Sequence, residues 1–313
     1  MPQKLSMKAL VRLYLTHRRG FGYGLRSQRF DLAAFARYAD RMSPGEPLTV
    51  SLALRWAKRG VVLPVTVANR LSTVRGLARF CSAFDPRTQV PPKRLTHSPV
   101  RRRAPHIFTD AQMKVILRRT RALSPWRTSP LRSLTYHTLI ALIACTGLRL
   151  GEALRLRDED FDAIAGTLRV PAVKCSPGRL LPLHPSTVRA LNRYQNKRRT
   201  QFPTVTRFFV GPVGSPIETS SADRTFRHLV RGIQCNGVRH NIRFYDLRHT
   251  LATKLIGRWS RQSIPLAHRL AMLSQYLGHK YFHHTYWYVQ HQRATLQTAA
   301  VRFERYQAEK NPR

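Results

Sequence analysis

The stretch that most restricts how this chain can fold is LTYHTLIALIACTG, residues 134–147. Its side chains are apolar almost without interruption, over a length that suits a helix better than a strand, and Gly147 is a residue type that commonly ends helices. We therefore predict a buried helix that other elements must surround. The run is shorter than the roughly 20 apolar residues of a membrane span, and no run elsewhere approaches that length.

The segments around this helix predict a mainly α domain with a small β-sheet, in the α+β class. Thr109 and Asp110 are residue types that cap helices, and the segment AQMKVILRRTRAL after them has a helical pattern. Residues 166–183, GTLRVPAVKCSPGRLLPL, alternate like a β-hairpin with CSPG as its turn. From residue 244 onward the pattern is helical again.

The first third of the chain has the pattern of a separate helical module. Turn signals separate four expected helices, at roughly 5–17, 25–41, 48–58 and 65–84. The segment PPKRLTHSPVRRRAPHIFT then brings four prolines and a run of arginines without periodicity, which is typical of an exposed basic linker. We place the domain boundary near residue 105, with the helical module at 1–105 and a second domain at 106–313.

The charge of the chain indicates a polyanionic partner. Lys and Arg total 55 against 15 Asp and Glu, so the formal net charge is +40, and a compact body with this charge repels itself unless a polyanion neutralises it. Nucleic acid is the expected partner, although charge alone does not choose DNA over RNA. The same charge would suit an RNA-binding structural protein or a basic membrane-surface protein. The arginines expected to contact nucleic acid are Arg101, Arg102, Arg103, Arg239 and Arg243.

The cysteines favour a reduced intracellular chain. All four lie far apart, without a C-x-x-C pair or the Cys/His spacing of a zinc finger. The N-terminal residues MPQKLSMKALVRLYL carry charges throughout and lack the apolar run of a signal peptide. We therefore expect a cytoplasmic protein at the nucleoid.

Three segments place phosphate-binding or proton-transfer groups at the ends of expected helices. The first is ACTGLRLGEALRL, in which Arg149 lies between the helix that Gly147 ends and a new helix. A guanidinium at such a junction can point into a cleft and hold two phosphate oxygens with its planar fork. The alternative is a structural ion pair between Arg149 and Glu152.

The second segment is RHNIRFYDLRHTLATKLI, residues 239–256. Asp246 is a cap residue, and the helix expected after it places Arg248 in its first turn, where backbone N–H groups and the helix dipole favour phosphate. We therefore choose Arg248 as a phosphate ligand. Arg243 lies in an irregular basic segment and is expected to contact the nucleic-acid backbone.

The third segment is LGHKYFHHTYWYVQH, residues 277–291, in which Gly278 ends a helix and leaves His279 in the turn. On a helix starting near Thr285, Tyr286 and Tyr288 are separated by roughly 200°, so they cannot face the same cleft and only one can be a nucleophile.

The other aromatic residues of this third segment have structural interpretations. Tyr281 and Phe282 are expected to pack in the turn. A zinc site built from His279, His283 and His284 is an alternative, but adjacent histidines rarely aim at one ion, and neither a cysteine nor a carboxylate joins them. We therefore expect no metal ion.

In order and spacing, these segments resemble the tyrosine recombinase family of the phage-integrase type. That family has an Arg in T-G-L-R-x-x-E, a lysine on a following β-hairpin, H-x-x-R before a helix, L-G-H, and a tyrosine nine residues further on. The corresponding residues here are Arg149, Lys174, Tyr245 with Arg248, His279 and Tyr288. The match spans about residues 135–305, and the helical module with its linker is similar, more weakly, to the family's core-binding domain.

The resemblance implies cleavage and rejoining of double-stranded DNA without metal, ATP or another cofactor. Tyr288 would attack a scissile phosphate to give a 3′-phosphotyrosine and a free 5′-hydroxyl. It further implies that the two arginines and His279 hold the phosphate oxygens in the transition state, and that Lys174 protonates the departing 5′-oxygen.

One position departs from the pattern of the family. Tyr245 stands where the family usually has histidine, and tyrosine is a poor base near neutral pH. Tyr245 is therefore expected to hydrogen-bond the phosphate rather than accept a proton from the nucleophile. His240, five residues upstream, is the alternative for the role of that histidine.

The resemblance also implies an assembly on DNA in a prokaryotic cell. Four protomers would work pairwise at the recombination site, whereas the free chain would be a monomer or weak oligomer. The tail at 297–313 could dock onto a neighbour or fold back onto its own domain. Two alternatives share parts of the pattern: a type IB topoisomerase-like enzyme, and a catalytically silent relative that binds DNA as an architectural factor.

Overall fold

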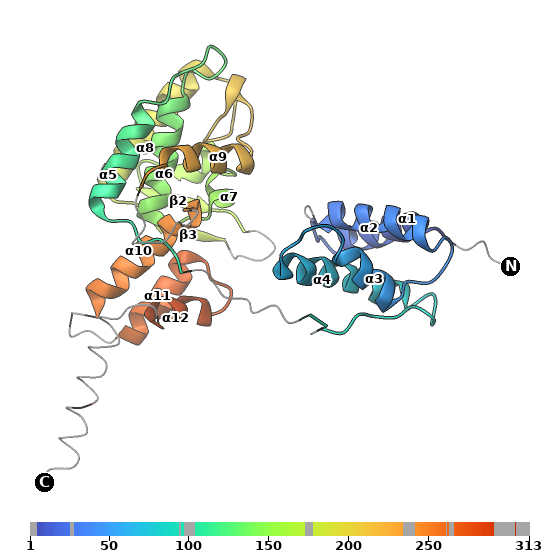
Figure 1. The fold of residues 1–313 in the computed structure, drawn as a ribbon. Coiled ribbons are helices and arrows are strands. Elements are labelled where there is room, and N and C mark those ends of the chain that lie inside the picture. The colour runs from blue at the N-terminus through green and yellow to red at the C-terminus, as the bar shows by residue number, and fades with distance from the viewer. Residues whose placement is uncertain are drawn as a thin grey trace, which may run out of the picture. The chain divides into compact units, whose positions relative to one another are not determined.

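The computed structural model consists of two compact units, Met1–Arg103 and Ala104–Arg313 (Figure 1). It describes residues 5–25, 28–93, 95–96, 104–172, 178–233, 242–260, 262, 266–290 and 304. Each unit has a hydrophobic core of its own. Helices dominate both, and a single three-stranded sheet occurs among the described residues, which confirms the predicted mainly helical fold class.

The first unit contains four helices around one core. They are α1 (Met7–Gly20), α2 (Gln28–Met42), α3 (Val50–Ala57) and α4 (Pro64–Cys81). The side chains of Ser6 and Thr49 cap α1 and α3, and Pro64 occupies the first turn of α4, where a missing N–H costs nothing. All four expected helices are present, with ends that differ by no more than three residues from the predicted ones.

The second unit surrounds the predicted buried helix, which is α6 (Arg132–Thr146). Its neighbours are α5 (Asp110–Arg121), α8 (Pro185–Gln201) and α10 (Phe244–Trp259). Leu139, Ile140 and Ile143 are almost completely buried between them. Gly147 ends the helix in the left-handed conformation, with φ of 66°, so both the burial and the end of this helix are confirmed.

The small sheet is antiparallel and follows the order β1 (Phe161–Asp162), β2 (Thr167–Val170), β3 (Arg179–Pro182). Leu168 pairs with Leu181 across β2 and β3, and both side chains enter the core. The predicted hairpin pairing is therefore confirmed, whereas its turn lies outside the described residues. β3 also contacts α11 (Leu266–Leu277), which brings the hairpin strand beside the C-terminal helices.

The C-terminal helices pack into a second, smaller core. α10 and α11 meet α12 (His283–Gln290), and the side chains of Ile256, Leu273 and Tyr288 are buried among them. The remaining elements are α7 (Leu150–Ala153), α9 (Thr219–Leu229) and the 3₁₀ turns η1 (Asp158–Asp160) and η2 (Pro212–Gly214). Within the described ranges, none of the helices has both the length and the apolar character to cross a membrane.

Two helix caps differ from the sequence prediction. α10 begins at Phe244, where the helical pattern was expected to begin, but Asp246 is not its N-cap: it occupies the third helical position, and its carboxylate accepts the backbone N–H of Arg243 at 2.9 Å. α12 begins at His283 rather than near Thr285.

Candidate active site

The guanidinium of Arg248 joins the ends of two helices that are far apart in sequence. The residue lies on α10 and is fully buried, with 0% of its surface exposed. Its Nη1 donates to the carbonyl oxygen of Gly147 at 2.7 Å, and its Nη2 donates to that of Leu277 at 2.7 Å. Burial, and next the charge of Arg149, lower the pKa of Arg248. The end of α6 and the end of α11 are therefore tied to one buried cation.

The position of Arg248 also corrects the sequence argument for it. Because α10 begins at Phe244, Arg248 is the fifth helical residue and does not lie in the first turn. The backbone N–H groups at the start of the helix and the dipole do not account for an anion site at this residue, since both act only within the first turn. Any affinity for phosphate here comes from the guanidinium itself.

Arg149 occupies the N-cap position of α7 and forms the ion pair with Glu152 that was the structural alternative for it. Its Nη1 forms an ion pair with Glu152 Oε1 at 2.8 Å, while its Nη2 donates to the carbonyl oxygen of Gly278 at 3.1 Å. Its side chain nevertheless keeps 34% of its surface exposed. The ion pair therefore holds a partly exposed guanidinium in place beside the turn that carries His279.

Arg179 on β3 is a residue of this cluster that sequence reasoning missed. Its Nη2 forms an ion pair with Glu152 Oε2 at 2.9 Å, and its Nε donates to the carbonyl oxygen of Tyr276 at 2.8 Å. Burial raises the pKa of Glu152, but the bonds and charges of Arg179 and Arg149 outweigh it and bring that pKa to about 2. The sequence feature that could have identified Arg179 is its position: an arginine at the start of an apolar strand, just after the predicted turn.

Tyr288 is the buried phenol of the cluster. Its ring is nearly parallel to that of His279, with centroids 6.2 Å apart, and its centroid lies 5.2 Å from that of His249. Burial raises the pKa of Tyr288 to about 12, although the nearby charge of Arg248 lowers it in part. Tyr288 is 2% exposed and Tyr286 is 50% exposed, so the two tyrosines face different directions, as their spacing predicts.

His279 follows Gly278 in the turn after α11 and is held by a hydrogen bond. Its Nδ1 lies 2.7 Å from Oγ1 of Thr285, which is fully buried. Burial lowers the pKa of His279 to about 3, and the charges of Arg248 and Arg149 contribute to this shift. The imidazole is therefore neutral at pH 7 and can hydrogen-bond an oxyanion without adding charge.

Tyr245 lies at the exposed side of the same cluster. It is in the first turn of α10 and partly exposed, and its ring meets that of His249 edge to face, with centroids 4.6 Å apart. His249 is buried between Tyr245 and Tyr288 and was also missed from the sequence. Its position four residues after Tyr245, on the same helix face, was the available signal.

The other predicted residues divide into two groups. Arg243 is half exposed on its side chain and lies 3.4 Å from Asp246. The residues outside the described ranges are Lys174, Arg101, Arg102, Arg103, Arg239 and His240.

The packing expected for Tyr281 and Phe282 is limited to ring contacts, with His283 for Tyr281 and with Tyr286 for Phe282, and about half of each side chain is exposed. In the part of the chain that the structure describes, no three His, Cys, Asp or Glu side chains group as a metal site would require.

The cluster has the parts needed to bind and attack a phosphate diester. Two guanidinium groups offer charge-assisted hydrogen bonds to its oxygens, a neutral imidazole offers another, and a phenol lies beside them. Within the described residues, Arg248 Nε is buried and has no hydrogen-bond partner. A buried N–H donor without a partner costs free energy, unless a ligand accepts its hydrogen bond.

Comparisons with known proteins agree with this chemistry. Residues 108–295 match the model of the phage integrase family. The chain is similar to the putative integrase/recombinase y4rB of Sinorhizobium fredii, with 34% identity covering 96% of this chain and 98% of that protein. Two solved recombinase structures share its fold at 18% identity. The structure of the XerH site-specific recombinase bound to palindromic difH DNA matches with a TM-score of 0.67, and the match covers 96% of this chain and 85% of the XerH chain. The structure of the Tn1549 transposon integrase with transposon right-end DNA matches with a TM-score of 0.66, and the match covers 95% of this chain and 98% of the integrase chain.

Proposed function

The chain belongs to the phage integrase family of tyrosine recombinases, enzymes of site-specific DNA recombination, and on this premise we propose that Tyr288 is its nucleophile. The Tyr288 hydroxyl loses its proton to solvent as its oxygen attacks the scissile phosphorus, the bond from phosphorus to the 5′-oxygen breaks, the departing oxygen gains a proton, and a 3′-phosphotyrosine and a 5′-hydroxyl result. Attack by a 5′-hydroxyl on the phosphotyrosine reverses the step and rejoins strands. The phosphodiester bond energy is kept in the covalent intermediate, so no ATP is consumed.

The observation that carries this proposal is the position of Tyr288 beside Arg248 and His279. A buried phenol with a pKa of about 12 is a weak nucleophile by itself. Arg248 and Arg149 bind the non-bridging oxygens and stabilise the charge that develops on them. The neutral His279 donates a hydrogen bond to the same phosphate. These side chains then stabilise the charge of the transition state, as metal ions do in many nucleases.

Two roles in the proposal come from the sequence pattern. Lys174, which lies between β2 and β3 in the sequence, protonates the departing 5′-oxygen. Tyr245 hydrogen-bonds the phosphate, because tyrosine as a residue type is a poor base near neutral pH. The first unit, as the core-binding domain, holds the duplex, and four protomers assemble on the recombination site of a prokaryotic chromosome or mobile element.

The experiment is covalent capture on DNA. A binding site is first selected from random duplexes by the purified chain, and a nicked version of it, from which the short cleaved strand diffuses away, is then incubated with each variant. Tyr288→Phe is expected to bind this DNA normally and to form no covalent adduct. Tyr286→Phe, the matched control two residues earlier, is expected to form the adduct as the wild type does.

The opposite results would each contradict a part of the proposal. If Tyr288→Phe forms the covalent adduct and Tyr286→Phe does not, the nucleophile is Tyr286 and not Tyr288. Binding without any adduct in the wild type would indicate a catalytically silent relative. Inhibition by a chelator would restore a metal-dependent mechanism. Relaxation of supercoiled DNA by a monomer, without strand exchange between sites, would indicate a type IB topoisomerase-like enzyme.

A further inference from the structure

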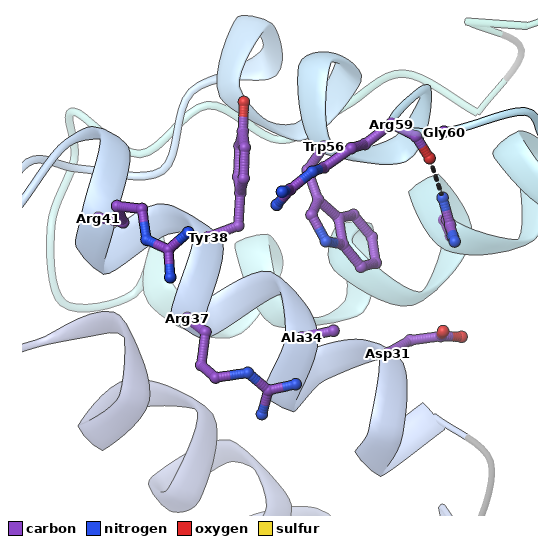
Figure 2. A pocket seen from close by; sticks show the side chains of 9 residues that line it. Asp31, Ala34, Arg37, Tyr38, Arg41, Trp56, Arg59 and Gly60 are labelled. Carbon is purple, nitrogen blue, oxygen red and sulfur yellow. Dashed lines mark hydrogen bonds between the residues drawn. The ribbon is translucent and has the colours of Figure 1, made fainter.

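We propose that the first unit contains a binding pocket for a single nucleotide, apart from the cluster around Tyr288. A hollow of about 560 Å³ lies between α2, the end of α3 and α4 (Figure 2). Arg37, Tyr38 and Arg41 line it from α2, Trp56 lines it from α3, and Arg59 lines it from the segment that follows α3. Its volume falls within the roughly 300–1,000 Å³ of sites that hold small organic ligands.

The floor of this nucleotide pocket is rigid. Trp56 is almost completely buried and meets Phe35 edge to face, with ring centroids 5.2 Å apart. Arg70 on α4 fixes the end of α3, because its Nη1 donates to the carbonyl oxygens of Ala57 at 3.2 Å and Arg59 at 3.1 Å. The pocket is therefore formed before any ligand arrives, which reduces the conformational entropy lost on binding.

The charge around the pocket favours an anion. Arg37 and Arg41 are one helical turn apart on α2 and exposed, and like charges at this spacing repel. Within the described residues, neither they nor Arg59 form an ion pair, and Asp31 is the one acidic residue that lines the hollow. A phosphate between the guanidinium groups would offset this repulsion with charge-assisted hydrogen bonds.

The aromatic wall selects a nucleotide over a bare phosphate. The guanidinium carbon of Arg59 lies 5.7 Å from the ring centroid of Tyr38, and Figure 2 shows that the two side chains extend on the same side of the pocket. Bases stack on tyrosine rings and on guanidinium planes alike, and each such stack contributes roughly 1–3 kcal/mol. A nucleoside phosphate offers both the anion and the flat ring. It can come from an unstacked nucleotide of a nucleic acid or from a free mononucleotide.

Binding titrations test this pocket without any need for cleavage. The full-length Tyr288→Phe chain, which should not cleave DNA, is titrated with dAMP, inorganic phosphate and a short single strand of deoxyadenosines at about 0.15 M salt, where long-range attraction is screened. The same titrations are repeated with Arg37→Gln/Arg41→Gln and with Tyr38→Leu added. Arg12→Gln/Arg19→Gln on α1 removes the same charge from exposed positions outside the pocket.

The pocket predicts a specific pattern of losses. Both pocket variants should lower the affinity for dAMP roughly tenfold or more, which corresponds to the loss of about one charge-assisted hydrogen bond or one stacked base. The α1 variant should leave the affinity for dAMP unchanged. If that pattern is seen with the single strand alone, the source is a nucleic-acid nucleotide. Equal weakening by the α1 variant would overturn the proposal. Phosphate binding as tight as dAMP binding, without any effect of Tyr38→Leu, would also overturn it.

Discussion

The two site arginines differ in how much of the fold depends on them. Arg248 is fully buried and satisfies two helix-end carbonyl oxygens, whereas Arg149 is one third exposed. Arg248→Ala should therefore lower the free energy of unfolding by roughly 2–4 kcal/mol, since it leaves a cavity and unpaired carbonyls. Arg149→Ala should lower it by about 1 kcal/mol. Both should reduce the rate of covalent capture at least a hundredfold, with DNA affinity nearly unchanged.

Denaturant unfolding and capture kinetics separate these effects. Arg248→Lys keeps the charge but loses the fork that reaches both carbonyl oxygens, so it should remain destabilised and inactive. Equal stabilities for Arg149→Ala and Arg248→Ala would contradict the structural difference between them. A loss of DNA affinity as large as the loss of capture would make the arginines phosphate anchors only.

Arg179 should act as a positioning residue through Glu152. In Arg179→Met the carboxylate loses the ion pair with Arg179 and keeps the one with Arg149, so the pKa of Glu152 rises and Arg149 is held less firmly. We expect capture to slow roughly tenfold to a hundredfold at saturating DNA, while the DNA affinity is kept. Arg179→Lys should restore part of the rate.

A double-mutant cycle identifies this route of action. If Arg179 works through Glu152, adding Arg179→Met to Glu152→Gln should slow capture little further than Glu152→Gln alone. Fully additive losses would show that Arg179 acts by another path, such as its bond to the carbonyl oxygen of Tyr276.

At the scale of elements, the site depends on how two helices end. Gly147 has φ of +66°, and a Cβ added there would lie 2.7 Å from Cδ2 of Leu277 and 3.1 Å from Cδ2 of Leu251. Gly147→Ala should cost about 1–3 kcal/mol of stability from backbone strain and crowding. It should also displace Leu277, whose carbonyl oxygen holds Arg248, so capture should fall further than the loss of stability explains.

Gly166→Ala is the matched control for this prediction. Gly166 has φ of +63°, so the backbone strain is similar, but the nearest atom to an added Cβ is 3.7 Å away on Val188. This variant should lose stability without a separate loss of capture. Equal capture by both variants, after correction for stability, would mean that the end of α6 does not position Arg248.

The elements that sequence predicted best are those with local patterns. The apolar run of α6 and the alternation of the hairpin follow from periods of the chain itself, and both were confirmed. The N-cap expected for α10 was wrong because aspartate serves equally at the N-cap and at the third helical position, which Asp246 occupies.

The contacts that sequence could not predict join distant segments. Arg179 pairs with Glu152 across 27 residues, and Arg248 reaches Gly147 across 101. Neither pairing has a periodic signature, because tertiary packing alone brings these residues together. The family pattern did include five residues of this cluster, Arg149, Tyr245, Arg248, His279 and Tyr288, but it did not include Arg179 or His249.

At the scale of the whole molecule, the two units should respond differently to acid. Glu152 and His279, whose pKa values are about 2 and about 3, both lie in the second unit. The ionised carboxylate of Glu152, whose pKa is lowered in the folded state, stabilises the fold above pH 4.5 by at most about 3 kcal/mol. This stabilisation is lost as the pH falls toward 2 and the carboxylate is protonated. His279 stays neutral when folded, so stability also falls as the unfolded chain gains its proton below pH 6.5.

Smaller shifts partly oppose this loss. Burial raises the pKa values of Asp223 and Asp246, which favours the folded second unit in acid, while the ion pair with Lys254 lowers that of Asp110 and adds to the loss. Because the two large shifts have the same sign, the second unit should lose stability on balance. Between pH 6.5 and 3 it should therefore unfold before the first unit does.

Hydrogen exchange followed at stepwise lower pH measures the two units separately in the intact chain. Peptides from α6, α10 and α11 should lose protection at a higher pH than peptides from α2 and α4. Glu152→Gln should be less stable at pH 7 but should flatten the pH dependence of the second unit between about 4.5 and 2. Glu159→Gln, at a side chain that is 67% exposed, is the control and should leave the slope unchanged. Earlier opening of the first unit, or equal flattening by both variants, would show that the Glu152 cluster does not set the acid stability of the catalytic unit.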